Sequence, residues 1–227
     1  MSVEFRLIER GYKKTLVLIP GWATDYRIFS GLDLGYNYLL PLETFSFTTI
    51  EGLLAALEKE SIDKVSLLGW SMGGFQATDF ALKHPLRVEK LILLSIREQY
   101  DSKTLENIAL KIKSNKRAFL YRFYLNCFSS FDSDALLWFK NNLMQDYLDN
   151  FPEQNLLCGL GYLRQASIKL QQLSLNFRVK IFHGEQDKIA PIGDIFKLKP
   201  LLPKLDFVNL RQAGHMVFLN PEFRNNF

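Results

Sequence analysis

The hexapeptide Gly69-Trp70-Ser71-Met72-Gly73-Gly74 constrains the fold of this chain more than any other stretch. An apolar run, residues 65–68, precedes it, and the pattern of residues 75–82 after it predicts a helix. A strand, a sharp turn and a helix with serine at the apex are typical of a nucleophile elbow. The glycines support this interpretation, because a strained apex and a close strand–helix approach need neighbours without a Cβ atom, here Gly69 and Gly73.

A serine at such an apex needs a base that takes its proton and a carboxylate that orients the base. The chain has three histidines, so the candidates for the base are few. His84 ends the helix after the elbow, before a proline, and we expect a surface or capping role for it. We expect a structural role for His183, at the end of a predicted strand. His215 lies in the loop after the last predicted strand and is the predicted base.

The predicted orienting acid is Asp187, just past the strand predicted at residues 179–182. Parallel sheets place their ligand-facing residues at this end of their strands. The chain order Ser71, Asp187, His215 is the Ser…Asp…His order of α/β-hydrolases. Asp187 could instead cap a turn, and the nearby Glu185 is the alternative acid.

Acyl transfer also needs hydrogen-bond donors for the oxyanion of the tetrahedral intermediate. The backbone N–H of Met72, the residue after the serine, is one predicted donor. The second is the backbone N–H of Trp22, in the loop after the strand predicted at residues 15–19. The indole ring of Trp22 would then form a wall of the pocket, or it could belong to the core.

Strand patterns alternate with helix patterns, so we expect an α/β fold, a mostly parallel sheet with helices on both faces. Predicted strands cover residues 4–8, 15–19, 36–42, 64–68, 90–95, 179–182 and 206–210, and helices start near residues 48–51 and cover 192–198. Between them, helical periodicity dominates. We therefore expect a core of residues 1–100 and 176–227, with residues 101–175 inserted as a helical cap, called the cap segment below.

Composition narrows the class of protein further. The 227 residues are 48% hydrophobic, enough for one domain with a substantial core. A net charge of +4 gives no reason to expect nucleic-acid binding, and no apolar run is long enough to span a membrane. The first 14 residues lack the basic-then-apolar order of a signal peptide, so we expect a cytoplasmic protein. We also expect a monomer. Cys127 and Cys158 lack metal-ligand spacing, so we expect reduced thiols, no metal and no cofactor.

These residues resemble the α/β-hydrolases over nearly the whole chain and, within them, the pimeloyl-[acyl-carrier protein] methyl ester esterases of biotin synthesis. The matching stretches are Pro20-Gly21-Trp22, the elbow hexapeptide, Lys83-His84-Pro85-Leu86-Arg87-Val88, Gly161-Tyr162-Leu163, Gly184 with Asp187, and Gly214-His215 with Asn220-Pro221-Glu222-Phe223. The resemblance implies Ser71 as nucleophile, Asp187 as orienting acid, His215 as base, Trp22 and Met72 at the oxyanion site, and Phe123 in the acyl pocket.

Two loops depart from the family pattern. Pro20-Gly21 stands where the family has His-Gly, and Leu42-Glu43-Thr44-Phe45-Ser46-Phe47 replaces a Gly-x-Gly-x-Ser turn. Both loops border the expected pocket, so they bear on the choice of substrate more than on the chemistry.

The cap segment is basic between residues 107 and 131, where five cations and no acidic residue precede Phe131. The cations are Lys111, Lys113, Lys116, Arg117 and Arg122. They form either a solvated helix face or a landing surface for an acidic partner, such as the acyl-carrier protein that the resemblance implies. The apolar residues among them, Leu120, Phe123, Tyr124 and Leu125, line either an acyl channel or the core of the cap segment.

The sequence therefore predicts a serine carboxylesterase that acts on the methyl ester of pimeloyl-acyl-carrier protein through an acyl-enzyme. A general carboxylesterase or lipase that cleaves small free esters is the main alternative. Another reaction of the same fold, such as carbon–carbon bond hydrolysis or haloperoxidase-like chemistry, and a ligand-binding protein without activity are the others.

Overall fold

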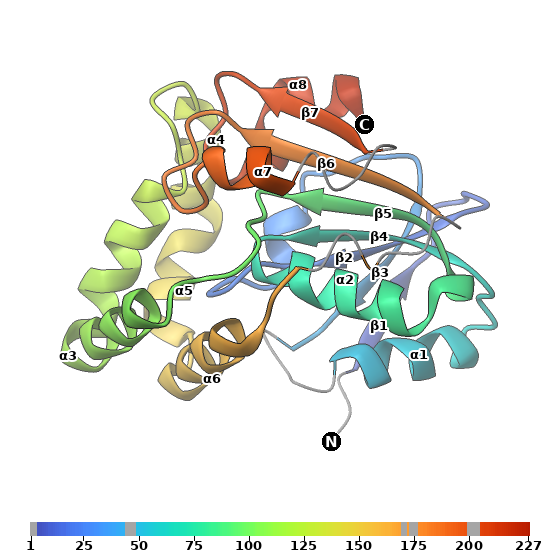
Figure 1. Cartoon of the computed structure of the whole chain (residues 1–227), viewed down its shortest axis with the longest axis horizontal. Coiled ribbons are helices and arrows are strands. Elements are labelled where there is room, and N and C mark those ends of the chain that lie inside the picture. Colours follow the sequence, from blue (N-terminus) through green and yellow to red (C-terminus); the bar gives the residue numbers. More distant parts are fainter. Residues whose placement is uncertain (1–3, 44–48, 169–171, 173–176, 199–204) are drawn as a thin grey trace.

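The computed structural model describes residues 4–43, 49–168, 172, 177–198 and 205–227. Within them, strands form one seven-stranded sheet in the order β1-β3-β2-β4-β5-β6-β7 (Figure 1). The strands are β1 Phe5–Ile8, β2 Thr15–Ile19, β3 Asn37–Pro41, β4 Val65–Trp70, β5 Val88–Leu94, β6 Arg178–Gly184 and β7 Asp206–Leu210. β1 pairs antiparallel with β3, and the other neighbouring pairs are parallel. The predicted mostly parallel α/β sheet is confirmed.

The central strands explain why apolar runs appear in the sequence. β2 and β4 are buried along their whole length, as expected of parallel strands covered on both faces. β1 and β2 follow each other through a turn in which Gly11 has a φ of 80°. They are not neighbours in the sheet, because β3 lies between them and pairs with both. The sequence predicted both strands but not their order in the sheet.

Helices pack around this sheet. They are α1 Thr49–Lys59, α2 Met72–Lys83, α3 Ser102–Asn126, α4 Ser133–Phe139, α5 Gln145–Asn150, α6 Glu153–Gln165, α7 Gly193–Leu198 and α8 Pro221–Asn226. α2 packs on β2, β4 and β5 and crosses in front of the sheet in Figure 1, with α1 beside it. None of the described helices combines the length and hydropathy needed to cross a membrane. Residues 44–48, which hold most of the loop that departs from the family pattern, lie outside the described residues.

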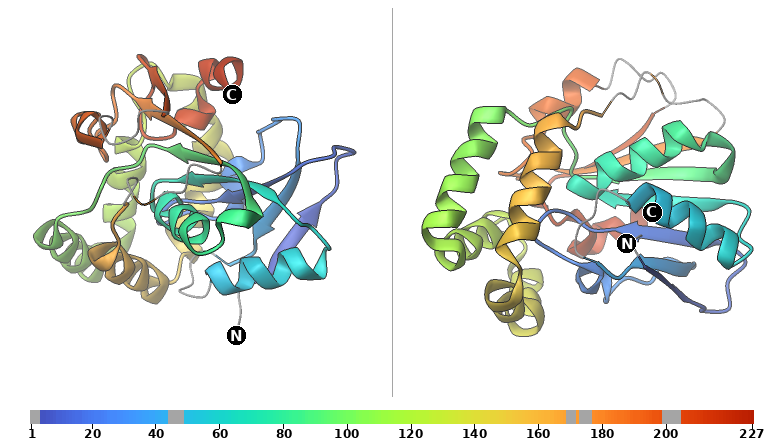
Figure 2. Two further views of the ribbon diagram at one scale, coloured as in Figure 1. Left: turned by 45° about the vertical axis from the view of Figure 1, so that its right-hand side comes forward. Right: turned by 90° about the horizontal axis from the view of Figure 1, so that it is seen from below.

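The cap segment lies at the carboxyl ends of the parallel strands, toward which the arrowheads of β4 and β5 point (Figure 1). Its longest helix, α3, is broken at Asn115, where φ is −157° and ψ is 86°. The Asn115 side chain accepts a hydrogen bond from the N–H of Ala118 at 2.9 Å and so restarts the helix. α6 and α5 both pack against α3 (Figure 2). The division into a core and an inserted cap domain stays a prediction.

The elbow packs as closely as its glycines require. A Cβ atom on Gly73 would overlap the carbonyl oxygens of Ile19 and Pro20, and one on Gly69 would overlap the backbone of Gly73. The end of β2, the end of β4 and the start of α2 therefore touch through their backbones.

We predict that Gly73→Ala lowers the free energy of unfolding by about 1–3 kcal/mol, because the backbone at this contact must move apart. Gly161→Ala in α6 is the control, because its Cβ would meet no atom within 4 Å and alanine favours a helix by roughly 0.5–1 kcal/mol. Urea denaturation of both variants measures the two effects. Wild-type stability in Gly73→Ala would show that the contact is not tight in solution.

Candidate active site

Ser71 lies at the junction of β4 and α2 in a backbone conformation that few residues adopt. Its φ is 52° and its ψ is −116°, and such geometry costs of order 1–3 kcal/mol unless the surroundings impose it. The Ser71 N–H donates to the carbonyl of Leu94 at the end of β5, at 2.9 Å, and the Ser71 carbonyl accepts from Gly74 at 2.9 Å. These bonds and the glycine contacts hold the strained apex, and Ser71 is 6% exposed.

Asp187 and His215 form a buried pair. Nδ1 of His215 donates to Oδ2 of Asp187 at 2.7 Å. The other carboxylate oxygen accepts the N–H groups of Ile189 and Ala190, each at 2.8 Å, so a turn orients the carboxylate toward the histidine. Glu185, the alternative acid, is exposed. Because Nδ1 carries the proton of this bond, Nε2 is the ring nitrogen with a lone pair, which is the form a general base needs.

The loop that carries His215 is fixed to the elbow and to the cap segment. The indole N–H of Trp70, the residue before Ser71, donates to the carbonyl of His215 at 2.9 Å, and the two rings lie 5.4 Å apart. The His215 N–H donates to the carbonyl of Cys127, at the end of α3, at 2.8 Å. The predicted base and the predicted nucleophile are therefore attached to adjoining parts of the structure.

Asp132 strengthens this attachment and was not identified from the sequence. Its buried carboxylate oxygen Oδ2 accepts the N–H groups of Gly214 and Ser129, each at 2.8 Å. The Ser129 hydroxyl also donates to the carbonyl of Gln212 at 2.9 Å. Asp132 stands before a helix, where aspartate is an ordinary cap, so the sequence held no signal that it binds the loop of His215.

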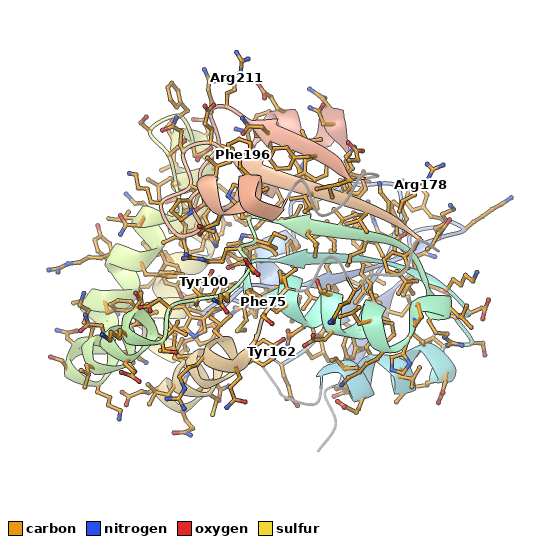
Figure 3. All side chains as sticks on the ribbon, viewed as in Figure 1. Phe75, Tyr100, Tyr162, Arg178, Phe196 and Arg211 are labelled. Carbon is orange, nitrogen blue, oxygen red and sulfur yellow. The ribbon has the colours of Figure 1, made fainter. Side chains whose placement is uncertain are left out.

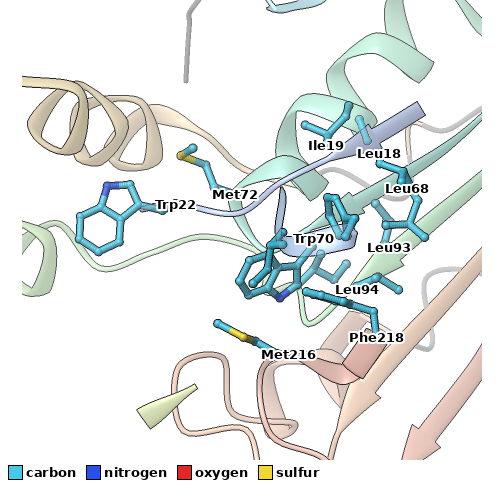
Figure 4. Close-up of a cluster of buried hydrophobic side chains, with 14 of the residues drawn as sticks. Leu18, Ile19, Trp22, Leu68, Trp70, Met72, Leu93, Leu94, Met216 and Phe218 are labelled. Atoms are coloured by element: carbon cyan, nitrogen blue, oxygen red, sulfur yellow. The ribbon is translucent and has the colours of Figure 1, made fainter. Parts of the chain in front are cut away.

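Trp22 and Met72 contact the cap segment, to which Phe123 belongs. The Trp22 ring contacts Phe123 edge-on at 5.0 Å, and its N–H donates to the carbonyl of Leu156 in α6 at 2.9 Å. A Cβ on Gly159 would lie 2.6 Å from the Trp22 ring and 3.5 Å from the Met72 sulfur, so both side chains abut α6. Figure 4 shows Trp22 and Met72 on the cap side of Trp70. The backbone of Trp22 as an oxyanion donor stays a prediction.

The apolar residues of α3 divide between two environments. Leu120 and Tyr124 are fully buried, and the Tyr124 hydroxyl donates to the carbonyl of Ala23, next to Trp22, at 2.6 Å. Phe123 and Leu125 are only partly buried. Ala23 itself has a φ of 60°, so the loop after β2 is strained as well as anchored.

Tyr100 is a second residue that the sequence did not identify. Its side chain lies next to that of Ser71, whose hydroxyl is near enough to influence the pKa of the phenol. Figure 3 shows it near Phe75. Its ring lies 6.1 Å from that of Phe75 and 4.9 Å from the guanidinium carbon of Arg97. Burial raises the pKa of Tyr100 to about 12, although the neighbouring Ser71 hydroxyl opposes the rise. Its position after β5, the neighbour of the elbow strand, was the one signal that could have identified it.

His183 is buried and is not the histidine paired with Asp187. Its Nε2 donates to the carbonyl of Ala190 at 2.7 Å and lies 3.6 Å from Oδ2 of Asp187. Its Nδ1 has no hydrogen-bond partner among the described residues. Burial lowers the pKa of His183 below its ordinary value. These features fit the structural role expected for it.

The cysteines and acidic groups show no arrangement for a metal. Cys127 is buried and Cys158 partly buried, and both are free thiols. Burial raises the pKa of the Cys127 thiol well above its ordinary value, and the nearby charge of Asp187 adds to the rise. In the part of the chain that the structure describes, no three His, Cys, Asp or Glu residues are grouped to hold an ion.

The five cations of the cap segment do not form one uniform surface. Lys116 donates to the carbonyl of Phe151 at 2.8 Å, and Arg117 forms an ion pair with Asp149. Both contacts fix the end of α5. Three other cations have no ion pair or hydrogen bond from their side chains within the described residues: Lys111, Lys113 and Arg122.

Comparison with known proteins gives the class of this fold and site. The family model described as alpha/beta hydrolase fold matches residues 40–222. The chain belongs to the α/β-hydrolase family. Solved structures agree: an esterase from Exiguobacterium antarcticum has a TM-score of 0.82 at 18% identity, with 99% of this chain and 93% of that chain covered. The enol-lactonase from Burkholderia xenovorans has a TM-score of 0.80 at 16% identity, with 98% and 92% covered.

Curated relatives are similar along nearly the whole chain. The pimeloyl-[acyl-carrier protein] methyl ester esterase of Legionella pneumophila (strain Paris) is 26% identical, over 96% of this chain and 94% of its own. The protein of the same name from Nitrosomonas europaea is 22% identical over 90% of both chains. The resemblance seen in the sequence is confirmed, and family and relatives together support a carboxylic ester hydrolase.

We predict that Asp187→Asn lowers kcat on the order of 10⁴-fold, because an amide stabilises the wrong tautomer of His215. Glu185→Gln, two residues away and exposed, is the matched control and should stay near the wild-type rate. Steady-state kinetics on one ester compares them. A large loss in the control with a small loss in Asp187→Asn would mean that Glu185 is the orienting acid.

We predict that the unfolding free energy falls as pH drops below about 6.5, the ordinary pKa of histidine, with His183 contributing up to about 1.4 kcal/mol per pH unit. The folded-state pKa of His183 is lowered, so the unfolded chain binds its proton first and folding loses stability from there down to the folded pKa. Urea denaturation from pH 8 to pH 5 of the wild type and His183→Gln measures the difference in slope. If the wild type and His183→Gln lose stability with pH at the same slope, the pKa of His183 is not lowered in the folded protein.

Proposed function

We propose that the chain is a serine carboxylesterase of the cytoplasm that hydrolyses the methyl ester of pimeloyl-acyl-carrier protein. The observation that carries the chemistry is the buried Asp187–His215 pair, attached through Trp70 to the strained apex at Ser71. The substrate is proposed from the relatives, whose names state that ester and whose lengths match this chain. No cofactor or metal takes part in the proposed reaction.

In the first half-reaction, Nε2 of His215 accepts the Ser71 proton as Oγ attacks the ester carbonyl. The negative charge that develops on the carbonyl oxygen is stabilised by the backbone N–H groups of Met72 and Trp22. The C–O bond to the alcohol then breaks. The alcohol leaves with the proton from His215, and the acyl group stays on Ser71.

In the second half-reaction, water replaces the alcohol. His215 accepts a proton from the water as its oxygen attacks the acyl-enzyme, and the same N–H groups stabilise the second oxyanion. The proton returns to Ser71 as the C–O bond breaks. Asp187 keeps its charge throughout and stabilises the imidazolium that forms twice in the cycle.

The partly buried ring of Phe123, against Trp22, is proposed to contact the acyl chain. The three cations without internal partners in the described residues, Lys111, Lys113 and Arg122, are proposed to attract an acidic carrier protein. Lys116 and Arg117 would act indirectly, by holding α5 in place. Because exposed charges steer encounter, this surface affects binding of the carrier rather than the chemical step.

One observation favours a general carboxylesterase for small free esters as the second candidate. The internal contacts of Lys116 and Arg117 remove two of the five cations from the expected landing surface. A weaker positive field attracts an acidic carrier less strongly, whereas a small neutral ester does not depend on that field.

Ser71→Ala tests the nucleophile. We predict a loss of activity on the order of 10⁶-fold, since the serine and histidine of such a triad act as a unit. Covalent labelling by a fluorophosphonate should occur in the wild type and be absent in Ser71→Ala. A variant that keeps more than about a hundredth of wild-type activity, against losses of that size, would place the nucleophile elsewhere.

Charge reversal tests the carrier. We predict that Arg122→Glu raises KM for methyl pimeloyl-carrier protein, that salt above about 0.1 M imitates the effect, and that a small methyl ester is cleaved at the wild-type rate. Lys13→Glu is the control, because it makes the same charge change in the turn before β2, at the end of the sheet away from the cap segment. Unchanged KM in Arg122→Glu would favour the general carboxylesterase.

A further inference from the structure

Tyr100 lies beside the proposed nucleophile but has no role in the proposed acyl-enzyme mechanism. It lies between β5 and α3, next to the Ser71 side chain, whose hydroxyl is near enough to lower the pKa of the phenol. Phe75 of α2 lies 6.1 Å from the ring and Arg97 of its own loop lies 4.9 Å from it. Asp194 of α7 in turn binds Arg97 at 2.8 Å. A hydroxyl held this firmly is a preorganised group, which is what a transition state requires.

The order of the strands decides which side of Ser71 this hydroxyl occupies. β4, which leads into Ser71, has β2 on one side and β5 on the other. Trp22 follows β2, so the proposed oxyanion donors lie on the β2 side. Tyr100 follows β5, and Asp187 and His215 follow β6 and β7, farther along the same side. Tyr100 is therefore on the opposite side of β4 from Trp22, the side that also carries Asp187 and His215, and it is close enough to Asp187 to feel its charge.

The tetrahedral intermediate has its own two sides. Its oxyanion must point to the N–H groups of Met72 and Trp22. Its alkoxy oxygen must point to His215, because that histidine gives it the proton with which the alcohol leaves. A hydroxyl next to Ser71 on the histidine side therefore adjoins the alkoxy oxygen and not the oxyanion.

We propose that Tyr100 is a catalytic residue that donates a hydrogen bond to the alkoxy oxygen of the ester as the alcohol leaves. The inference rests on the proposed function and names its substrate class, esters of poorly leaving alcohols such as methanol. Tyr100 keeps its own proton, and His215 still supplies the proton that departs with the alcohol. In the second half-reaction the attacking water takes the place of the alcohol and is oriented by the same hydroxyl.

The protonation state of the phenol agrees with a donor role. Because burial raises the pKa of Tyr100 to about 12, the hydroxyl stays protonated at any pH where His215 works as a base. The Arg97 guanidinium beside the ring acts in the opposite direction, yet the pKa stays above the ordinary value.

Tyr100→Phe tests the inference, because it removes one oxygen and keeps the ring that Phe75 and Arg97 contact. The readout is kcat/KM, which reports acylation, on two esters of one acid: a methyl ester and a p-nitrophenyl ester. A hydrogen bond to a developing charge corresponds to a loss of about 10- to 100-fold on the methyl ester. For the p-nitrophenyl ester, kcat/KM should fall less than about threefold. Its alcohol is a good leaving group, so the hydrogen bond from Tyr100 adds little in the transition state.

Tyr38→Phe is the matched control. Tyr38 is also buried, but its hydroxyl bonds to the backbone of Leu32 and Leu34, across β2 from the elbow. It should leave the ratio of the two kcat/KM values unchanged. Equal losses on both esters in Tyr100→Phe would mean that the hydroxyl only positions Ser71, and no loss would mean that it has no part in the reaction. Either result overturns the inference.

The proposed function fails in a different way. If the wild type cleaves neither ester and Ser71 resists a fluorophosphonate, the serine hydrolase proposal is wrong, and the inference about Tyr100 is wrong with it. If the wild type cleaves both esters and only the ratio in Tyr100→Phe is unchanged, the proposed function stands and the inference alone is overturned.

Discussion

The backbone contact between the start of α2 and the end of β2 is the constraint on which the rest of the site depends. Gly73 touches the carbonyls of Ile19 and Pro20 so closely that no side chain fits. This contact, with the bond from Ser71 to Leu94, holds the serine at a φ that its Cβ disfavours. The strain is local, and it is offset by packing along the buried strands β2 and β4.

The same packing places the two sides of the reaction. Strands on either side of β4 end in different loops, so the predicted oxyanion donors and the histidine approach Ser71 from opposite directions. Tyr100 joins the histidine side for the same topological reason. In the proposed reaction, the oxyanion and the leaving oxygen of one ester would therefore contact loops on opposite sides of β4.

The cap segment also holds the loop that carries His215. The carbonyl of Cys127 and the carboxylate of Asp132 bind the loop of His215, so the end of α3 and the residues after it help to hold the predicted base. Lys116 and Arg117 likewise hold the end of α5 in place. Changes in the cap segment can therefore reach the chemistry, which is why its charges are best judged against a small neutral ester.

The sequence by itself determined the α/β class, the elbow and the residues of the predicted triad. Periodicity reports which faces are buried, and the glycine spacing reports a contact that only glycine allows. The pairing of Asp187 rather than Glu185 with His215 was expected from the sequence and is present in the structure as a hydrogen bond. The catalytic roles of these residues stay predictions.

Only the tertiary structure decided the order of the strands, the break at Asn115 and the partners of Lys116 and Arg117. It also decided which residues outside the motifs reach the site, Tyr100 and Asp132 among them. The physical reason is that these contacts join residues far apart in the chain. A single tyrosine or aspartate shows no periodicity, and its partner is set by which loops the packed sheet brings together.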